Sequence, residues 1–154
     1  MNARYLQPEP QVLQRPFHLL CVDDDPYTSD ALARSFAEFE IQVLRAYDGM
    51  QGYWRVLKDK PAGVISDLSM PNGNGIEMIQ CLRRNATTEF LPIIVLTGTN
   101  DRELRRQLRK LNVSAVLEKP TNATEILLEL YLADFFSESL QIEHLLESAI
   151  AASA

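Results

Sequence analysis

The sequence predicts an α/β fold in which five strand–helix pairs form a doubly wound, parallel five-stranded sheet. Two observations carry this prediction. Short apolar runs alternate with segments whose apolar residues recur at helical spacing, and polar cap residues stand where the helical segments begin. The chain has 154 residues, 46% of them hydrophobic and 23% charged, which is typical of a globular domain.

The strands are predicted from the apolar runs. Each run is nearly continuous in apolar residues, as is typical of parallel strands that helices cover on both faces. The five predicted strands are residues 17–22, 41–46, 63–66, 92–97 and 114–117.

The helices are predicted from stripes of apolar residues three or four positions apart. In chain order the stripes are Leu32, Phe36 and Phe39; Met50, Tyr53, Trp54 and Leu57; Ile79 and Leu82; and Leu104, Leu108 and Leu111. A fifth segment, residues 126–136, is apolar at nine of 11 positions, so it must be covered on more than one face.

The helix starts are marked by residues that accept hydrogen bonds from the first helical turn. In four places Asp or Asn stands three residues before Glu or Gln, which resembles a capping box. These pairs are Asp48 with Gln51, Asn74 with Glu77, Asn100 with Glu103, and Asn122 with Glu125. Asp25 before Pro26 is typical of a cap followed by proline in the first turn.

The two ends of the chain differ from this alternating part. We expect a loose N-terminal arm over the proline-containing residues 1–16, a globular domain over 17–136, and a helical extension or linker stub over 137–154. The extension has an apolar stripe of helical spacing, formed by Ile142, Leu145, Leu146, Ala149 and Ile150.

The net charge of −6 lies in one part of the sequence. Residues 1–119 contain 15 acidic and 15 basic residues, whereas residues 120–154 contain six acidic residues and no Lys or Arg. Nucleic-acid binding needs surplus cations, so we expect no direct contact with nucleic acid. No apolar run is long enough to span a membrane, and no secretory signal is present. Cys21 and Cys81 stand in apolar contexts, so we expect buried, reduced thiols in a cytoplasmic protein.

Polar side chains follow four of the five predicted strands. Asp23 and Asp24 follow the first strand, Asp67 follows the third, Thr97 ends the fourth, and Lys119 follows the fifth. The carboxyl ends of parallel strands share one edge of the sheet, where ligands bind. Each residue alone has an ordinary role, in a turn or as a solvated cation. Together, the clustered carboxylates would repel one another unless a cation compensates them.

The types of ligand at this edge predict the ion and its chemistry. A few carboxylates without His or Cys suit Mg²⁺ completed by water, and such Mg²⁺ sites usually serve phosphate. An Asp carboxylate can be the nucleophile that accepts a phosphoryl group. Lys119 and Thr97 are candidates for stabilising the charge on that group.

Four short motifs occur in order along the chain: VDDDP at 22–26, SDLSMPNGNG at 66–75, VLTGT at 95–99 and EKP at 118–120. Their order and spacing resemble the receiver domain of two-component response regulators, over about residues 17–136. The resemblance implies a flavodoxin-like strand order of 2-1-3-4-5. It also implies a signalling domain, which takes a phosphoryl group from a sensor histidine kinase or a phosphotransfer protein and catalyses only its own phosphotransfer and dephosphorylation.

The resemblance implies roles for the residues at the strand ends. Asp67 is implied as the phosphoacceptor, Thr97 as the hydroxyl that moves onto the phosphoryl group, and Lys119 as the lysine that neutralises it. The bond from Lys119 to Pro120 is expected to be cis. The family usually has Tyr or Phe three residues before this lysine, where Val116 stands here. Valine is compact and stiff, so it cannot make the inward swing by which the aromatic ring follows the threonine in this family.

The resemblance also implies a metal site and the loops beside it. The Mg²⁺ ligands would be Asp24 directly, Asp23 largely through water, Asp67, and the backbone carbonyl of Ser69. The other matching loop residues are Met70, Pro71 and Gly75 after the phosphorylation site, and Ser69 and Thr99, which tune dephosphorylation in this family.

Two segments are candidates for contacts with a partner. The segment 101–111 carries five basic residues, which form either a solvated helix face or part of the surface that switches on phosphorylation. If the chain forms a homodimer, we expect the contact between the basic fourth helix and the acidic fifth helix, or through the C-terminal helix. The residues after 136 are too few for an output domain, so the chain is either a stand-alone protein or the receiver of a larger regulator.

Two other functions remain as alternatives. A haloacid-dehalogenase-like phosphatase would use Asp23 and Asp25, but this chain lacks the acidic pair that such enzymes need after the lysine. A pseudo-receiver that binds partners without phosphate is opposed by the complete set of site residues.

Overall fold

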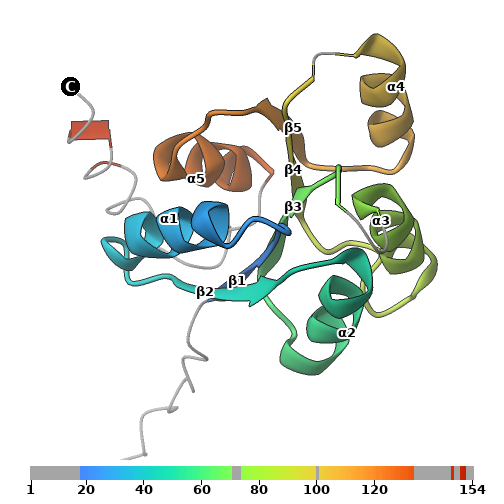
Figure 1. Cartoon of the computed structure of the whole chain (residues 1–154), viewed down its shortest axis with the longest axis horizontal. Coiled ribbons are helices and arrows are strands. Elements are labelled where there is room, and N and C mark those ends of the chain that lie inside the picture. The colour runs from blue at the N-terminus through green and yellow to red at the C-terminus, as the bar shows by residue number, and fades with distance from the viewer. Residues whose placement is uncertain (1–17, 71–73, 100, 134–146, 148–149, 152–154) are drawn as a thin grey trace, which may run out of the picture.

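The computed structural model describes residues 18–70, 74–99, 101–133, 147 and 150–151. Along these residues strands and helices alternate (Figure 1). The strands are β1 (His18–Val22), β2 (Gln42–Ala46), β3 (Gly63–Asp67), β4 (Ile93–Thr97) and β5 (Ala115–Glu118). The helices are α1 (Pro26–Ala37), α2 (Gly49–Asp59), α3 (Gly75–Arg84), α4 (Arg102–Lys110) and α5 (Ala123–Leu132).

The strands form one parallel sheet in the order β2-β1-β3-β4-β5. This order confirms the predicted doubly wound α/β fold, and each strand begins and ends within one residue of its predicted range. The chain winds outward to β2 and then returns past β1 to β3. The winding therefore reverses between β1 and β3, which is where ligands bind in such sheets.

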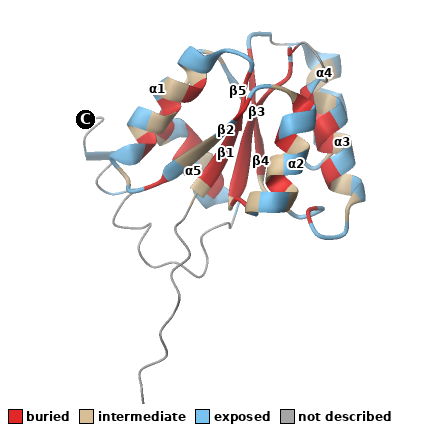
Figure 2. Ribbon diagram, turned by 60° about the horizontal axis from the view of Figure 1, so that its bottom comes forward, coloured by how far each residue is buried: buried red, intermediate tan, exposed pale blue. Residues whose placement is uncertain are grey.

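Helices cover both faces of the sheet, with α1 and α5 on one face and α2, α3 and α4 on the other (Figure 1). Successive residues of a strand point to opposite faces. Leu19 and Cys21 accordingly pack with α1 and α5, whereas Leu20 and Val22 pack with α2, α3 and α4. Figure 2 shows the strands buried between helices whose outer faces are exposed.

The cap residues predicted from the sequence are confirmed at every helix start except that of α4. The confirmed caps are Asp25, Asp48, Asn74 and Asn122. For the fourth helix the prediction is wrong, because the cap is Asp101, whose carboxylate accepts a hydrogen bond from the backbone N–H of Glu103. Asn100 itself lies outside the described residues. Two good cap residues stand side by side here, so sequence spacing alone cannot choose between them.

The apolar stripe predicted for α2 is wrong in part. Met50 and Trp54 are 69% and 62% exposed, whereas Gly52 and Val56 are buried. A Cβ atom at Gly52 would lie 2.5 Å from Sδ of Met78, so the helix approaches its neighbours through glycine. The face of α2 was misassigned because glycine contributes nothing to a hydrophobic pattern.

Three other expectations can be compared with the structure. Cys21 is buried as predicted, but Cys81 is exposed, and both thiols are free. Phe39 lies beyond the end of α1 and still packs against the core. Within the described ranges, no helix is both long and apolar enough to cross a membrane.

Candidate functional site

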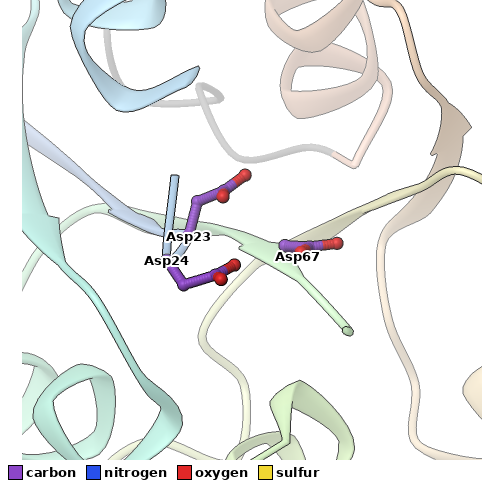
Figure 3. A group of neighbouring side chains, drawn as sticks. All are labelled: Asp23, Asp24 and Asp67. Atoms are coloured by element: carbon purple, nitrogen blue, oxygen red, sulfur yellow. The ribbon is translucent and has the colours of Figure 1, made fainter. Parts of the chain in front are cut away.

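The carboxyl ends of four strands bring the predicted site residues to one edge of the sheet. Asp23 and Asp24 follow β1, Asp67 and Thr97 are the last residues of β3 and β4, and Lys119 follows β5. Because β1 and β3 are neighbours, carboxylates that are far apart in sequence meet at this edge. Figure 3 shows Asp23, Asp24 and Asp67 side by side.

The three carboxylates form a compact acidic group. One oxygen of each of Asp23, Asp24 and Asp67 lies within 4.8 Å of the others. Asp23 and Asp67 are buried, whereas Asp24 is exposed, so the group opens to solvent on the Asp24 side. Backbone groups orient the two buried carboxylates: the N–H of Asp25 donates to Oδ1 of Asp23 at 2.9 Å, and the N–H of Leu68 donates to Oδ1 of Asp67 at 2.8 Å.

Lys119 is a cation that faces this acidic group. Its Nζ lies 3.1 Å from Oδ2 of Asp23 and 3.5 Å from Oδ1 of Asp67. Burial acts to lower the pKa of Lys119, but the hydrogen bond to Asp23 and the charge of both carboxylates outweigh it and raise the pKa above its usual value. Lys119 therefore remains charged.

Asp67 keeps an unfavourable charge in spite of Lys119. Burial raises the pKa of Asp67, Lys119 opposes this effect, and the charge of Asp23 adds to it, so the pKa remains above its ordinary value. The lysine thus compensates the carboxylates only in part. The remaining excess of negative charge favours binding of a further cation at this edge.

Two residues, Ser66 and Gly75, lie against the backbone carbonyl oxygen of Asp67. The hydroxyl of Ser66 donates to the backbone oxygen of Asp67 at 2.7 Å. A Cβ atom on Gly75, the first residue of α3, would overlap the same carbonyl oxygen, so α3 can approach β3 only with glycine here. Sequence reasoning did not identify Ser66 as a support, although it is the one hydroxyl in an otherwise apolar run before Asp67.

The hydroxyl of Thr97 is engaged in the turn after β4. Thr97 is buried, and its Oγ1 accepts from the N–H of Thr99 at 3.2 Å and donates to the oxygen of Thr99 at 3.3 Å. A Cβ atom at the intervening Gly98 would meet nothing within 4 Å, so the turn borders open space. Thr97 thus lies at the predicted edge with its hydroxyl bonded to its own loop.

The remaining predicted residues lie around the acidic group at different depths. Ser69 is exposed just after β3, and Thr99 is exposed just after β4. Met70 is buried in the core on the side of α2, α3 and α4. Pro71 lies outside the described residues. The bond between Lys119 and Pro120 is cis, as predicted.

Val116 links β5 to α4. Its side chain is half-buried against the core that α2, α3 and α4 cover. Its backbone oxygen accepts a hydrogen bond from Nη1 of Arg105 in α4 at 3.5 Å. Valine is stiff and compact, so the large inward swing of an aromatic ring is not possible at this position.

A mainly apolar groove adjoins Lys119 between α1 and the loop before α5. Besides Lys119, it is lined by Thr28, Ala31, Leu32, Leu96, Pro120 and Thr121. A protein that approaches the acidic group from the side of α1 would meet this groove.

A five-stranded doubly wound sheet with an acidic group and a lysine at its carboxyl edge defines a class of domain. The family described as "Response regulator receiver domain" matches residues 19–131, from β1 to α5. The chain therefore belongs to the response regulator receiver family, which confirms the resemblance inferred from the motifs.

Several curated proteins are similar to this chain. A probable chemotaxis protein CheY of Rhizobium etli is 34% identical over 66% of this chain and 80% of its own length. The response regulator MprA of Mycolicibacterium vanbaalenii is 32% identical over 73% of this chain and 48% of its own length. The hybrid signal transduction histidine kinase D of Dictyostelium discoideum is 27% identical over 81% of this chain and 8% of its own length. The chain thus spans less than half of the last two relatives.

Solved structures support the fold. Chemotaxis protein CheY4 of Vibrio cholerae has a TM-score of 0.71 and 24% identity, over 77% of this chain and 99% of that protein. A sensor protein from Polaromonas sp. JS666 has a TM-score of 0.70 and 27% identity, over 77% of this chain and 96% of that protein.

Proposed function

We propose that this domain is a phosphorylation switch in which Asp67 accepts a phosphoryl group from a histidine of a sensor kinase or of a phosphotransfer protein. One observation carries the proposal: Nζ of Lys119 lies 3.5 Å from Asp67 and 3.1 Å from Asp23, beside a carboxylate group that needs further cationic charge. The domain is a signalling domain by family, and its own phosphotransfer and dephosphorylation are the only reactions we assign to it.

The chemistry of the donors fits Mg²⁺. Three carboxylates lie together without His or Cys among them, which suits a hard cation with few protein ligands. We propose that Asp24 and Asp67 bind Mg²⁺ directly, Asp23 largely through water, and Ser69 through its backbone carbonyl. The ion supplies positive charge to the oxygens of the transferred phosphoryl group.

In the proposed transfer, a carboxylate oxygen of Asp67 forms a bond to phosphorus while the P–N bond to the donor histidine breaks. The imidazole leaves with the bonding electron pair and takes up a proton from solvent. Lys119 compensates the charge on the phosphoryl oxygens. In dephosphorylation, an oxygen of water forms a bond to phosphorus while the P–O bond to Asp67 breaks, so inorganic phosphate leaves and the carboxylate is restored. The exposed residues Ser69 and Thr99 tune the access of that water.

We propose that Thr97 transmits the change to the surface formed by α4, β5 and α5. The hydroxyl of Thr97 gives up its hydrogen bonds to the backbone of Thr99 and bonds to the phosphoryl group instead. The turn that leads into α4 moves as a result. Val116 cannot follow as an aromatic ring would, and the hydrogen bond from Arg105 to Val116 offers another connection between α4 and β5. Met70, Pro71 and Pro120 belong to the loops that recognise partners.

The proposed partners follow from this role. The phosphodonor docks at the edge beside Lys119, and the groove between α1 and the loop before α5 is available to it. The switched surface acts on a partner, on an output domain, or on a second copy through α4 and α5. We place the domain in the cytoplasm and propose no direct contact with nucleic acid.

Incubation with acetyl phosphate and Mg²⁺ tests the proposal. Intact-mass spectrometry should show one added phosphoryl group, because one Asp carboxylate is the acceptor. Removal of Mg²⁺ with a chelator should abolish the addition. Asp67→Asn should also abolish it, whereas Asp48→Asn, which changes an Asp that caps α2, should leave it intact.

Two outcomes would overturn the assignment. Attachment of the phosphoryl group to Asp23, or repeated turnover of a phosphate ester, would point to a phosphatase instead. The structure gives no support to that alternative, because Asp25, its second catalytic residue, caps α1 through the N–H of Tyr27.

A further inference from the structure

The outer face of α5 has an apolar stripe that the described part of the chain does not cover. Leu128, Tyr131 and Leu132 are 44%, 41% and 67% exposed, and their spacing places them on one side of the helix. The residues on the other side are buried in the core: Ala123, Ile126, Leu127 and Leu130. Helix α5 is therefore apolar on two faces, and the folded domain covers one of them.

A second amphipathic stripe follows α5 in the chain. Its members are Ile142, Leu145, Leu146, Ala149 and Ile150. The backbone is helical at residues 147 and 150–151, and Ile150 is 60% exposed. This apolar stripe therefore also needs a surface to cover it.

We propose that residues 139–150 form a helix that folds back, within the same molecule, onto the stripe of Leu128, Tyr131 and Leu132. Six residues, 133–138, connect the two helices, which is within the usual range for antiparallel neighbours. As a helix the segment is about 18 Å long and α5 is about 15 Å long, so the segment can cover the whole stripe.

The length of the connection favours this occupant over a second copy. A short connection holds the segment beside α5 at an effective concentration on the order of millimolar. This is higher than the concentration of free molecules in dilute solution. Two copies, each with a net charge of −6, also repel each other. Glu147 lies off the apolar stripe and Glu143 lies at its margin, seven residues before Ile150, so both can reach solvent when the segment docks.

Charge also affects the docking within one molecule. Helix α5 contributes Glu125 and Glu129, the segment contributes Glu143 and Glu147, and residues 120–154 contain no Lys or Arg. The two helices therefore repel each other weakly while their apolar stripes attract. Because salt screens exposed charges, docking should become tighter as the ionic strength rises.

Hydrogen–deuterium exchange of the full-length protein, followed by mass spectrometry, tests the proposal. We expect amides within 140–150 to exchange at least tenfold faster in Leu132→Asp than in the wild-type protein. Met50→Asp is the matched control, because Met50 is similarly exposed, at 69%, on the opposite side of the sheet. Leu145→Asp places the charge on the segment and should cause the same loss of protection. The far-ultraviolet circular dichroism of each variant checks that the domain stays folded.

Sedimentation separates the possible occupants. A monomer whose segment is protected, and loses that protection in Leu132→Asp, supports the proposal. Equal exchange in the wild-type and Leu132→Asp proteins would overturn it. A wild-type dimer that Leu132→Asp dissociates would also overturn it, because a second copy would then cover α5. None of these readouts requires phosphorylation, so they are independent of the role proposed for Asp67.

Discussion

At Asp67, position and ionisation are in conflict. The side chain ends a buried strand, and burial raises the pKa of its carboxyl group above the ordinary value, even though Lys119 opposes the effect. The role of phosphoacceptor that we propose for Asp67 nevertheless requires an ionised carboxylate, which can attack phosphorus. The folded domain therefore carries a charge that it does not fully compensate, which is common at functional sites.

This charge has a consequence for stability in the absence of Mg²⁺. An acid whose pKa is raised in the folded state loses its proton first in the unfolded state. The stability of the wild-type protein therefore falls as pH rises from the ordinary value of 3.8 to the raised pKa, and stays lower above it. Asp67→Asn removes this penalty, so we expect its Tm at pH 7 to exceed that of the wild-type protein by roughly 1–4 °C.

Calorimetry at several pH values checks the sign. The difference in Tm between Asp67→Asn and wild type should disappear as pH falls below 3.8, where both side chains are neutral. Asp48→Asn exchanges one good helix cap for another, so its Tm should follow the wild type throughout. A Tm of Asp67→Asn below that of wild type at pH 7 would show that the ion pair with Lys119 outweighs the burial penalty.

At the scale of elements, the sequence was most informative where pattern and topology coincide. The strands were predicted because each is a short apolar run, and the site followed because parallel strands bring Asp67, Thr97 and Lys119 to one edge. The contact from Ser66 to Asp67 and the bond from Arg105 to Val116 depend on three-dimensional neighbours, so no spacing in the sequence reveals them.

Helix α2 shows why the face of a helix can be misjudged. Gly52 faces Val22 and Met78, where a Cβ atom would lie within 3.1 Å of three side-chain atoms. A larger residue must push the helix away from the sheet, so we expect Gly52→Leu to destabilise the domain by about 1–3 kcal/mol. Trp54→Ala, on the exposed side of the same helix, should cost less than about 1 kcal/mol.

Urea denaturation of the two variants decides between the two faces of α2. If Trp54→Ala cost more than Gly52→Leu, the stripe of Met50, Tyr53, Trp54 and Leu57 would be the buried face after all. Gly52→Ala separates the steric effect from helix propensity. Alanine favours the helix by about 1 kcal/mol over glycine, and this gain opposes the displacement of Met78.

At the scale of the whole molecule, the site connects strand ends that lie far apart in the sequence. Lys119, which follows β5 at one edge of the sheet, bonds to Asp23, which follows β1 near the other edge. Asp24 and Asp67 complete the acidic group from β1 and β3. An ion bound there would contact segments from two strands at once, and only the folded chain brings these segments together.

Binding of Mg²⁺ should therefore stabilise the whole domain against unfolding. An ion that binds only the folded state adds about 2.7 kcal/mol when its concentration is 100 times Kd, so we expect Tm to rise by roughly 5–10 °C under that condition. Asp24→Asn removes an exposed carboxylate that we propose as a ligand, and it should abolish most of the rise. Its neighbour Asp25 is also exposed but caps α1, a role that asparagine fills equally well, so Asp25→Asn should keep the full rise. Calorimetry over a Mg²⁺ titration measures all three proteins. Equal rises in Asp24→Asn and Asp25→Asn would mean that the ion binds elsewhere, and the acidic group would then need only Lys119 as its counter-charge.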